Sequence, residues 1–71
     1  MEISEIRALA DEEIRARLLD QREELMNFRF QQATGELVDH NQLRSTRRTI
    51  ARMLTVLRER EIIAGIEEGE E

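Results

Sequence analysis

The side chains best suited to chemistry in this chain are the arginines between residues 40 and 60. This segment holds six arginines and one acid, a net charge of +5. Arg44, Arg48 and Arg52 recur every four residues, so on a helix they form a ridge. Guanidinium groups in this register donate forked hydrogen bonds at a spacing suited to successive phosphates. The pattern therefore predicts binding to a polyanion.

Neighbouring residues extend this ridge. Arg47 and Arg58 are expected between the ridge and an apolar stripe of the same helix, and Thr55 continues the ridge before Glu59 ends it. The ordinary alternative is that these arginines line a solvated face and pair with acids of a partner helix. No acid lies between Arg44 and Arg58, so the ridge has no ion partners at helical spacing of its own, which favours an external anion.

The chain offers no set of side chains for catalysis. The single histidine, His40, has no cysteine, tyrosine or second histidine to work with, and its expected place at a helix start indicates a structural or solvent-facing role. Adjacent carboxylates such as Glu23 and Glu24 diverge on a helix, so they indicate solvated charge. No phosphate-binding glycine loop or metalloprotease motif occurs. We therefore expect no enzyme, no catalytic residue, no metal site and no cofactor.

The total charge of the chain hides its basic segment. The 71 residues carry 16 acids and 11 arginines, a net charge of −5 at pH 7, and no lysine. Residues 1–39 hold five arginines and ten acids, and residues 61–71 hold five acids and no base. The two acidic ends thus mask the basic middle, which keeps a polyanionic partner possible. No apolar run or leader-like start indicates a membrane or secretory segment, so we expect an intracellular protein without a membrane partner.

Two long helices are predicted to position the arginines. Proline is absent, and the interior carries one break, at Thr34-Gly35. The predicted elements are a helix over about 11–34, a turn over about 35–39 and a helix over about 40–62. A connection of about six residues predicts that the helices lie antiparallel. The expected fold class is all-α, a long antiparallel two-helix hairpin with a short N-terminal helical turn.

Capping residues indicate where these helices begin and end. Asp11 is expected to cap the first long helix, and Ser4 is expected to cap the short N-terminal turn, which folds back over the hairpin. Asp39 and Gln42 have capping-box spacing at the start of the second long helix. Gly35 suits the left-handed close of the first.

Apolar stripes at helical spacing predict where the two helices pack together. The expected seam residues are Ile14, Leu18, Leu25 and Phe28 on the first helix and Leu43, Ile50, Leu54 and Leu57, flanked by Met53, on the second. A further stripe on the first helix comprises Leu19, Met26 and Phe30. Phe28 and Phe30 are two residues apart and cannot both face the seam. Phe30 and Met26 are therefore expected to pack against the N-terminal turn or against another protein.

The C-terminal end differs in composition from the hairpin. Residues 64–71 contain two glycines and four glutamates, which predicts an acidic disordered tail. Residues 1–63 are then expected to form the hairpin domain, which would bind a polyanion such as RNA. We expect no homo-oligomer.

Two segments, residues 26–37 (MNFRFQQATGEL) and 43–59 (LRSTRRTIARMLTVLRE), closely resemble the family of the bacterial large ribosomal subunit protein twenty-nine. The family pattern has an aromatic or apolar pair around Arg-Phe-Gln, then Ala-Thr-Gly, then Arg-Arg-x-Ile-Ala-Arg with a closing Thr-x-Leu. The likeness covers about residues 3–60. Where the family often has Asn-Pro this chain has Asp39-His40, and unlike the generally basic family it is acidic and lacks lysine.

The resemblance implies a structural constituent of the large ribosomal subunit in the cytoplasm, which supports translation by binding ribosomal RNA near the polypeptide exit tunnel. It implies contact with ribosomal protein twenty-three and with nascent-chain factors at the tunnel exit. The RNA-contacting residues that it implies are Arg29, Gln31, Thr34, Gly35, Arg44, Arg47, Arg48, Arg52 and Thr55, and the charge pattern adds Arg58. An alternative hypothesis is an adaptor that binds another protein through Leu19, Met26 and Phe30.

Overall fold

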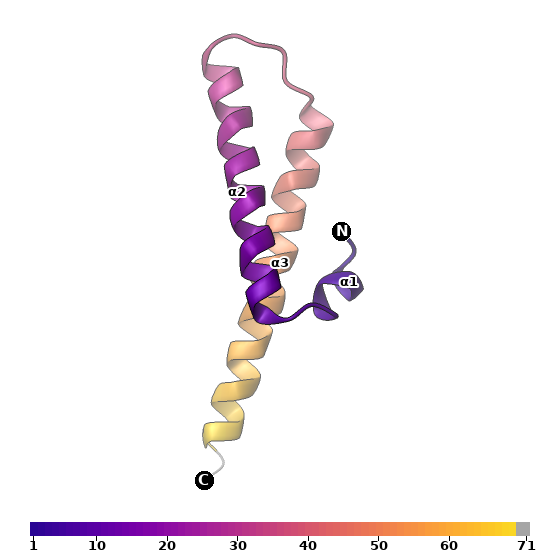
Figure 1. The fold of residues 1–71 in the computed structure, drawn as a ribbon, viewed down its shortest axis with the longest axis vertical. Helices are drawn as coiled ribbons and strands as arrows, with labels where there is room; N and C mark the ends of the chain where they lie inside the picture. Colours follow the sequence, from indigo (N-terminus) through magenta and orange to yellow (C-terminus); the bar gives the residue numbers. More distant parts are fainter. Residues whose placement is uncertain (70–71) are drawn as a thin grey trace.

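The protein is a rod-shaped helical hairpin. The computed structural model describes the backbone of residues 1–69 and the side chains of residues 1–66. Its helices are α1 (Ile3–Arg7), α2 (Asp11–Ala33) and α3 (His40–Gly69). α2 and α3 run antiparallel, and α1 folds back beside α3, within overall extents of 56 × 20 × 16 Å (Figure 1). The predicted all-α hairpin with a short N-terminal helical turn is confirmed.

The turn that joins the long helices begins at a left-handed glycine. Gly35 has φ +82°, and its N–H donates to the carbonyl of Gln32 at 3.2 Å. The N–H of Glu36 donates to the carbonyl of Gln31 at 2.9 Å. This pair of bonds is a Schellman close, which satisfies two of the free carbonyls at the end of α2. The predicted break at Thr34-Gly35 is confirmed.

The helix starts agree with the predicted caps at one position and differ at two. Asp39 caps α3, because its carboxylate accepts from the N–H of Asn41 at 2.9 Å and of Gln42 at 3.4 Å. Ala10 stands at the N-cap of α2, so the prediction that Asp11 caps this helix is wrong. Ser4 lies inside α1, which starts after Glu2, so its predicted capping role is also wrong.

The core lies where α1, α2 and α3 meet. Its buried members are Ile6, Ile14, Leu18, Met53 and Val56, with Ile3, Leu9, Ile50 and Leu57 packed against them. α3 therefore buries side chains against both other helices, and the buried arc is wider than a two-helix seam would need. This wider arc explains why Thr46 and Thr49, which the sequence left outside the seam, are also buried. Leu54, predicted in the seam, is 41% exposed and lies beyond the edge of this arc.

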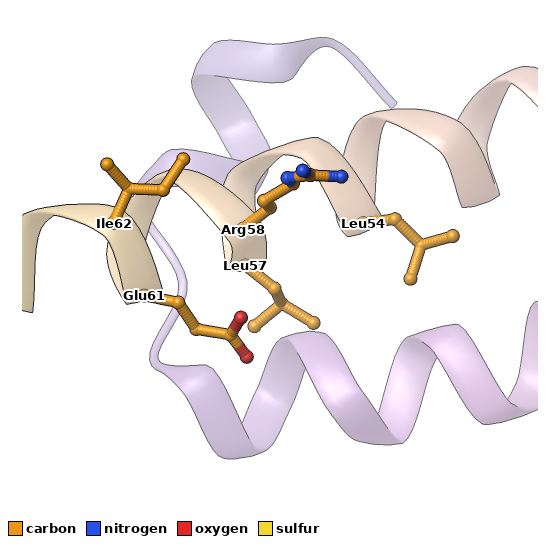
Figure 2. A pocket seen from close by; sticks show the side chains of 5 residues that line it. All are labelled: Leu54, Leu57, Arg58, Glu61 and Ile62. Atoms are coloured by element: carbon orange, nitrogen blue, oxygen red, sulfur yellow. The ribbon is translucent and has the colours of Figure 1, made fainter. Parts of the chain in front are cut away.

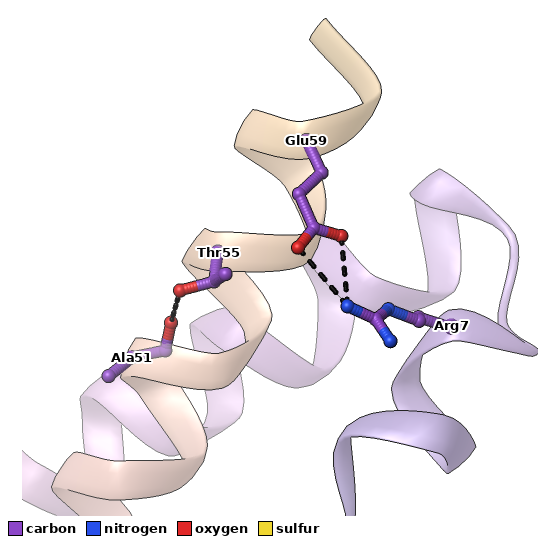
Figure 3. Close-up of polar contacts among 4 residues, drawn as sticks. All are labelled: Arg7, Ala51, Thr55 and Glu59. Atoms are coloured by element: carbon purple, nitrogen blue, oxygen red, sulfur yellow. Dashed lines mark hydrogen bonds and ion pairs between the residues drawn. The ribbon is translucent and has the colours of Figure 1, made fainter. Parts of the chain in front are cut away.

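Arginine side chains hold α1 and the following link against α3. Arg60 donates to the carboxylate of Asp11, to the carbonyl of Arg7 at 3.0 Å and to the carbonyl of Leu9 at 2.8 Å. Arg7 in turn forms an ion pair with Glu59 at 3.1 Å (Figure 3). Asp11 thus uses its carboxylate to anchor the link between α1 and α2 instead of capping α2.

α3 extends past its predicted end near residue 62 and reaches Gly69. A single glycine such as Gly65 weakens a helix by about 1 kcal/mol but does not block the backbone bond pattern as proline does. The prediction of disorder from residue 64 is therefore wrong up to residue 69, and residues 70–71 of the predicted tail lie outside the described part of the chain. Among the described helices, none is long and apolar enough to cross a membrane.

Candidate nucleic-acid interface

The arginine ridge of α3 occupies the side of the helix opposite its buried residues. Positions 44, 48, 51, 55 and 58 follow one another at steps of three or four residues, and all are exposed. Positions 49, 53 and 56 are buried on the other side. Packing of the core therefore fixes which way the ridge points. Arg47, also exposed, is a neighbour of Arg44 on the helix surface and lies on the same side of α3 as Arg58.

Ion pairs within the chain leave this ridge free. Within residues 1–66, the ion pairs are Arg7 with Glu59 and Arg60 with Asp11, both at the junction of α1 with α3. None of Arg44, Arg47, Arg48 and Arg58 has a carboxylate within 4.0 Å in this part of the chain. The alternative in which these arginines pair with acids of the partner helix is thus not what the structure shows. Their positive charge is directed to solvent.

Two residues expected in the ridge have local partners. The guanidinium of Arg52 is half-buried and donates through Nη1 to the carbonyl of Met1 at 3.1 Å. The hydroxyl of Thr55 donates to the carbonyl of Ala51 at 2.8 Å (Figure 3). Arg52 therefore lies on the side of α3 that faces the N-terminus. The exposed row that begins at Arg44 and Arg48 continues to Arg58 and does not include Arg52.

The remaining predicted RNA contacts from the first motif lie at or near the tip of the hairpin. Gln31 is half-buried and its carbonyl accepts both from the N–H of Glu36 and from the hydroxyl of Thr34, the latter at 3.1 Å. Thr34 and Gly35 are exposed at the end of the rod. These three residues shape the turn, so they fix the backbone that the tip presents to a partner.

The two long sides of the hairpin differ: α1 lies against one of them and leaves the other uncovered. On one flank, a pocket next to the N-terminus is lined by Arg17, Asp20 and Gln21 of α2 and by Thr49 and Met53 of α3. α1 covers this flank. Helical register places a second set of α2 residues, at positions 15, 22 and 29, on the opposite flank.

This opposite flank carries arginines from both long helices. Arg15, Arg22 and Arg29 recur every seven residues, are exposed, and have no carboxylate within 4.0 Å among the described side chains. Together with the ridge of α3 they form what we call the arginine face: Arg15, Arg22, Arg29, Arg44, Arg47, Arg48 and Arg58. Arg15 and Arg22 were both missed as site residues, although their seven-residue spacing to Arg29 was a usable signal.

The second apolar stripe of α2 lies beside these arginines and is open to solvent. Leu19, Met26 and Phe30 are 61%, 68% and 70% exposed. Each of Leu19 and Met26 follows an arginine of the face by four residues, so the rows are neighbours on α2. α1 packs against α3 and the start of α2 instead. Of the two alternatives predicted for Phe30, packing against the N-terminal turn is therefore wrong, and contact with another protein stays a prediction.

The fold and the surface together define a class of protein. The rod has a thin core and a cationic face, His40 is exposed at the start of α3, and no group of three His, Cys, Asp or Glu side chains within the described residues is placed to hold a metal ion. It belongs to the class of small all-α hairpin proteins with an exposed cationic face.

Comparison with known proteins identifies the family. The sequence pattern described as Ribosomal L29 protein matches residues 4–60. The large ribosomal subunit protein uL29 of Streptomyces avermitilis is 53% identical over 64 residues, which cover 90% of this chain and 84% of that protein. The uL29 protein of Mycobacterium tuberculosis is 55% identical over 58 residues, covering 82% and 75%.

The chain belongs to the ribosomal L29 protein family. It is accordingly a structural constituent of the large ribosomal subunit, active in translation and located in the cytoplasmic ribosome. This family is one of structural proteins and not of enzymes.

Proposed function

We propose that the arginine face binds ribosomal RNA of the large subunit near the polypeptide exit tunnel, and that the hairpin supports translation by holding this RNA in place. The observation that carries the proposal is the set of exposed arginines on both long helices without carboxylate partners among the described residues. Exposed guanidinium groups on a rigid rod form charge-assisted bonds to phosphates and release counterions. Membership of the family indicates that the partner is the large ribosomal subunit. The arginine face is the surface of this chain that is suited to bind the RNA of that subunit.

We propose that the chain recognises the shape of the RNA backbone more than the sequence of its bases. α3 positions Arg44 and Arg48 one helical turn apart, so their side chains start about 5–6 Å from each other. This spacing resembles the separation of neighbouring phosphates along a strand. Arg58 lies on the same side of α3, about 15 Å further along the helix. Double-stranded RNA is recognised largely through such phosphate and sugar contacts. The exposed tip residues Thr34 and Gly35 are proposed to touch RNA through the backbone of the turn.

We further propose that the stripe of Leu19, Met26 and Phe30 contacts a neighbouring protein, which the resemblance implies is ribosomal protein twenty-three, and that nascent-chain factors dock close by. The large exposed fraction of all three side chains supports a protein contact, because apolar side chains gathered on one face mark interaction surfaces. This stripe also supports the adaptor hypothesis. The two functions are compatible, because the arginine face and the stripe are separate rows of α2.

Incorporation into large subunits tests the RNA proposal. The wild-type chain and an Arg44→Gln, Arg48→Gln variant are mixed in equal amounts with subunits lacking this protein, and the subunits are sedimented after a high-salt wash. We expect the wild-type chain to predominate in the pellet, because the variant makes fewer phosphate contacts.

The matched control is an Arg7→Gln, Arg17→Gln variant, which loses the same charge from α1 and from the flank of α2 beside it. Because this variant also loses the Arg7–Glu59 ion pair, circular dichroism should show that it keeps the helix content of the wild-type chain. Equal recovery of the Arg44→Gln, Arg48→Gln variant and the wild-type chain would contradict the RNA proposal. For the stripe, Phe30→Ser is expected to weaken binding to the neighbouring protein and leave RNA affinity unchanged. If Phe30→Ser binds that protein as the wild-type chain does, the stripe is not its contact.

A further inference from the structure

The C-terminal part of α3 projects beyond the hairpin. Arg60 pairs with Asp11 in the first turn of α2, so the helix from residue 61 onward has no α2 residue beside it (Figure 1). This projecting part carries three exposed apolar side chains: Ile62, Ile63 and Ile66 are 54%, 56% and 58% exposed. Three isoleucines within five residues of solvated helix serve no purpose in the core of this chain.

An open groove joins these isoleucines to the hairpin. It has a volume of about 640 Å³ and is lined by Leu54, Leu57, Arg58, Glu61 and Ile62 (Figure 2). Figure 2 shows Leu57 and Glu61 on the side that faces α2, and Arg58 and Ile62 on the other side of α3. Leu54, which the core does not cover, provides the apolar wall at the far end. The groove ends at Ile62, and Ile66 lies about one turn further along the same side of α3. We call Leu54, Leu57, Ile62 and Ile66 the isoleucine end; Ile63 lies on the opposite side of the helix from Leu54.

We propose that the isoleucine end is a docking surface for a basic amphipathic segment of another polypeptide. The apolar side chains of such a segment would enter the groove and cover the isoleucines, as an amphipathic helix does in helix-in-groove recognition. Its lysines or arginines would pair with the acids of this end. The surface adjoins the arginine face at Arg58, which lines the groove, but it does not depend on the proposed RNA contact.

Charge selects this occupant over the alternatives. Residues 61–71 carry five glutamates and no basic residue, and the groove itself holds Glu61 together with one arginine, Arg58. Like charges disfavour RNA phosphates at this end, and they disfavour a second copy of the chain, whose own end is equally acidic. A cationic apolar segment satisfies both the charge and the exposed isoleucines. Electrostatic attraction would also speed its encounter with the acidic end.

The test measures peptide binding to the full chain by fluorescence anisotropy. The probe is a labelled helical peptide with leucine on one face and lysine on the other. The first comparison peptide has glutamate in place of lysine, and the second has serine in place of leucine. We expect the lysine–leucine peptide to bind well above both. An Ile62→Ser, Ile66→Ser variant should lose about tenfold or more in affinity, because both side chains are covered in the complex.

Two further variants locate the contact. Leu37→Ser changes an exposed leucine in the turn at the opposite end of the rod and should leave peptide affinity unchanged. Glu61→Gln should weaken binding and flatten its dependence on salt. The isoleucines lie outside the core, so circular dichroism should show that every variant keeps the helix content of the wild-type chain.

Four results would overturn the proposal. Peptide affinity could be unchanged by the Ile62→Ser, Ile66→Ser variant, or the glutamate peptide could bind as well as the lysine peptide. Sedimentation equilibrium could instead show a dimer that the same two substitutions abolish, which would make a second copy the occupant. RNA affinity measured in parallel should be unaffected by these substitutions, and a matching loss of RNA affinity would assign this end to RNA.

Discussion

Arg60 is the residue that the structure marks as holding α1 and its link to the hairpin. Its guanidinium reaches three acceptors from the N-terminal part of the chain: the carboxylate of Asp11 and the carbonyls of Arg7 and Leu9. We predict that Arg60→Ala lowers the free energy of unfolding by about 2 kcal/mol. This magnitude combines roughly 0.5–1.5 kcal/mol for each backbone bond with the roughly 0–1 kcal/mol of a partly exposed ion pair.

Thermal unfolding followed by circular dichroism measures this effect. In a chain of this size, 1 kcal/mol corresponds to about 4–8 °C in Tm, so Arg60→Ala should lower Tm by roughly 8–16 °C. Arg60→Lys should lose most of the same stability, because an ammonium group cannot reach all three acceptors at once. Urea unfolding at low temperature gives the free energy independently.

Arg58→Ala is the matched control for Arg60→Ala. Arg58 lies two residues away on the same helix, is exposed, and has no carboxylate partner among the described residues. Its loss should change stability by less than about 0.5 kcal/mol. If Arg60→Ala and Arg58→Ala unfolded at the same temperature, the assignment of Arg60 as the residue that holds α1 would be refuted.

Three further changes test the turn, the cap and the core. Gly35→Ala should destabilise the fold by about 1–2 kcal/mol, measured by urea unfolding, because φ +82° is strained for a residue with a Cβ although the space around it is open. Asp39→Ala should lower the free energy of unfolding by about 1 kcal/mol in the same assay, because the cap of α3 is lost. Asp39→Asn should keep most of the capping stability, because asparagine also caps helices. Ile6→Ala should lower the free energy of unfolding by about 2–4 kcal/mol, because Ile6 is fully buried. Amide hydrogen exchange should show faster opening of α1 in this variant. Protection equal to that of the wild-type chain would mean that α1 does not depend on this contact.

Local sequence signals predicted the hairpin, because its main features depend on neighbouring residues. The break at Gly35 and the cap at Asp39 follow from backbone geometry and from one side chain each. The contacts of Arg60 could not be predicted in this way, because its partners lie about 50 residues earlier in the chain. Periodicity describes a helix surface and does not show which distant segment covers it. Val56 was missed for the same reason, because α1 adds a second packing face to α3.

The candidate site was predictable to the extent that it consists of exposed rows on one helix. Arg44, Arg47, Arg48 and Arg58 are where the spacing placed them. Arg52 has the same spacing but a different neighbour, because the N-terminus reaches its side of α3. Arg15 can be assigned to the arginine face only when the orientation of α2 relative to α3 is known.

The salt dependence of binding to ribosomal RNA tests the central claim most directly, because it counts phosphate contacts. Affinity of the wild-type chain is measured at several salt concentrations beside the Arg44→Gln, Arg48→Gln variant and the Arg7→Gln, Arg17→Gln variant. We predict that the first variant lowers the slope of log affinity against log salt by about 1.4–1.8, at roughly 0.7–0.9 per lost contact, and that the second variant keeps the wild-type slope. Equal slopes for all three chains would contradict RNA binding through the arginine face.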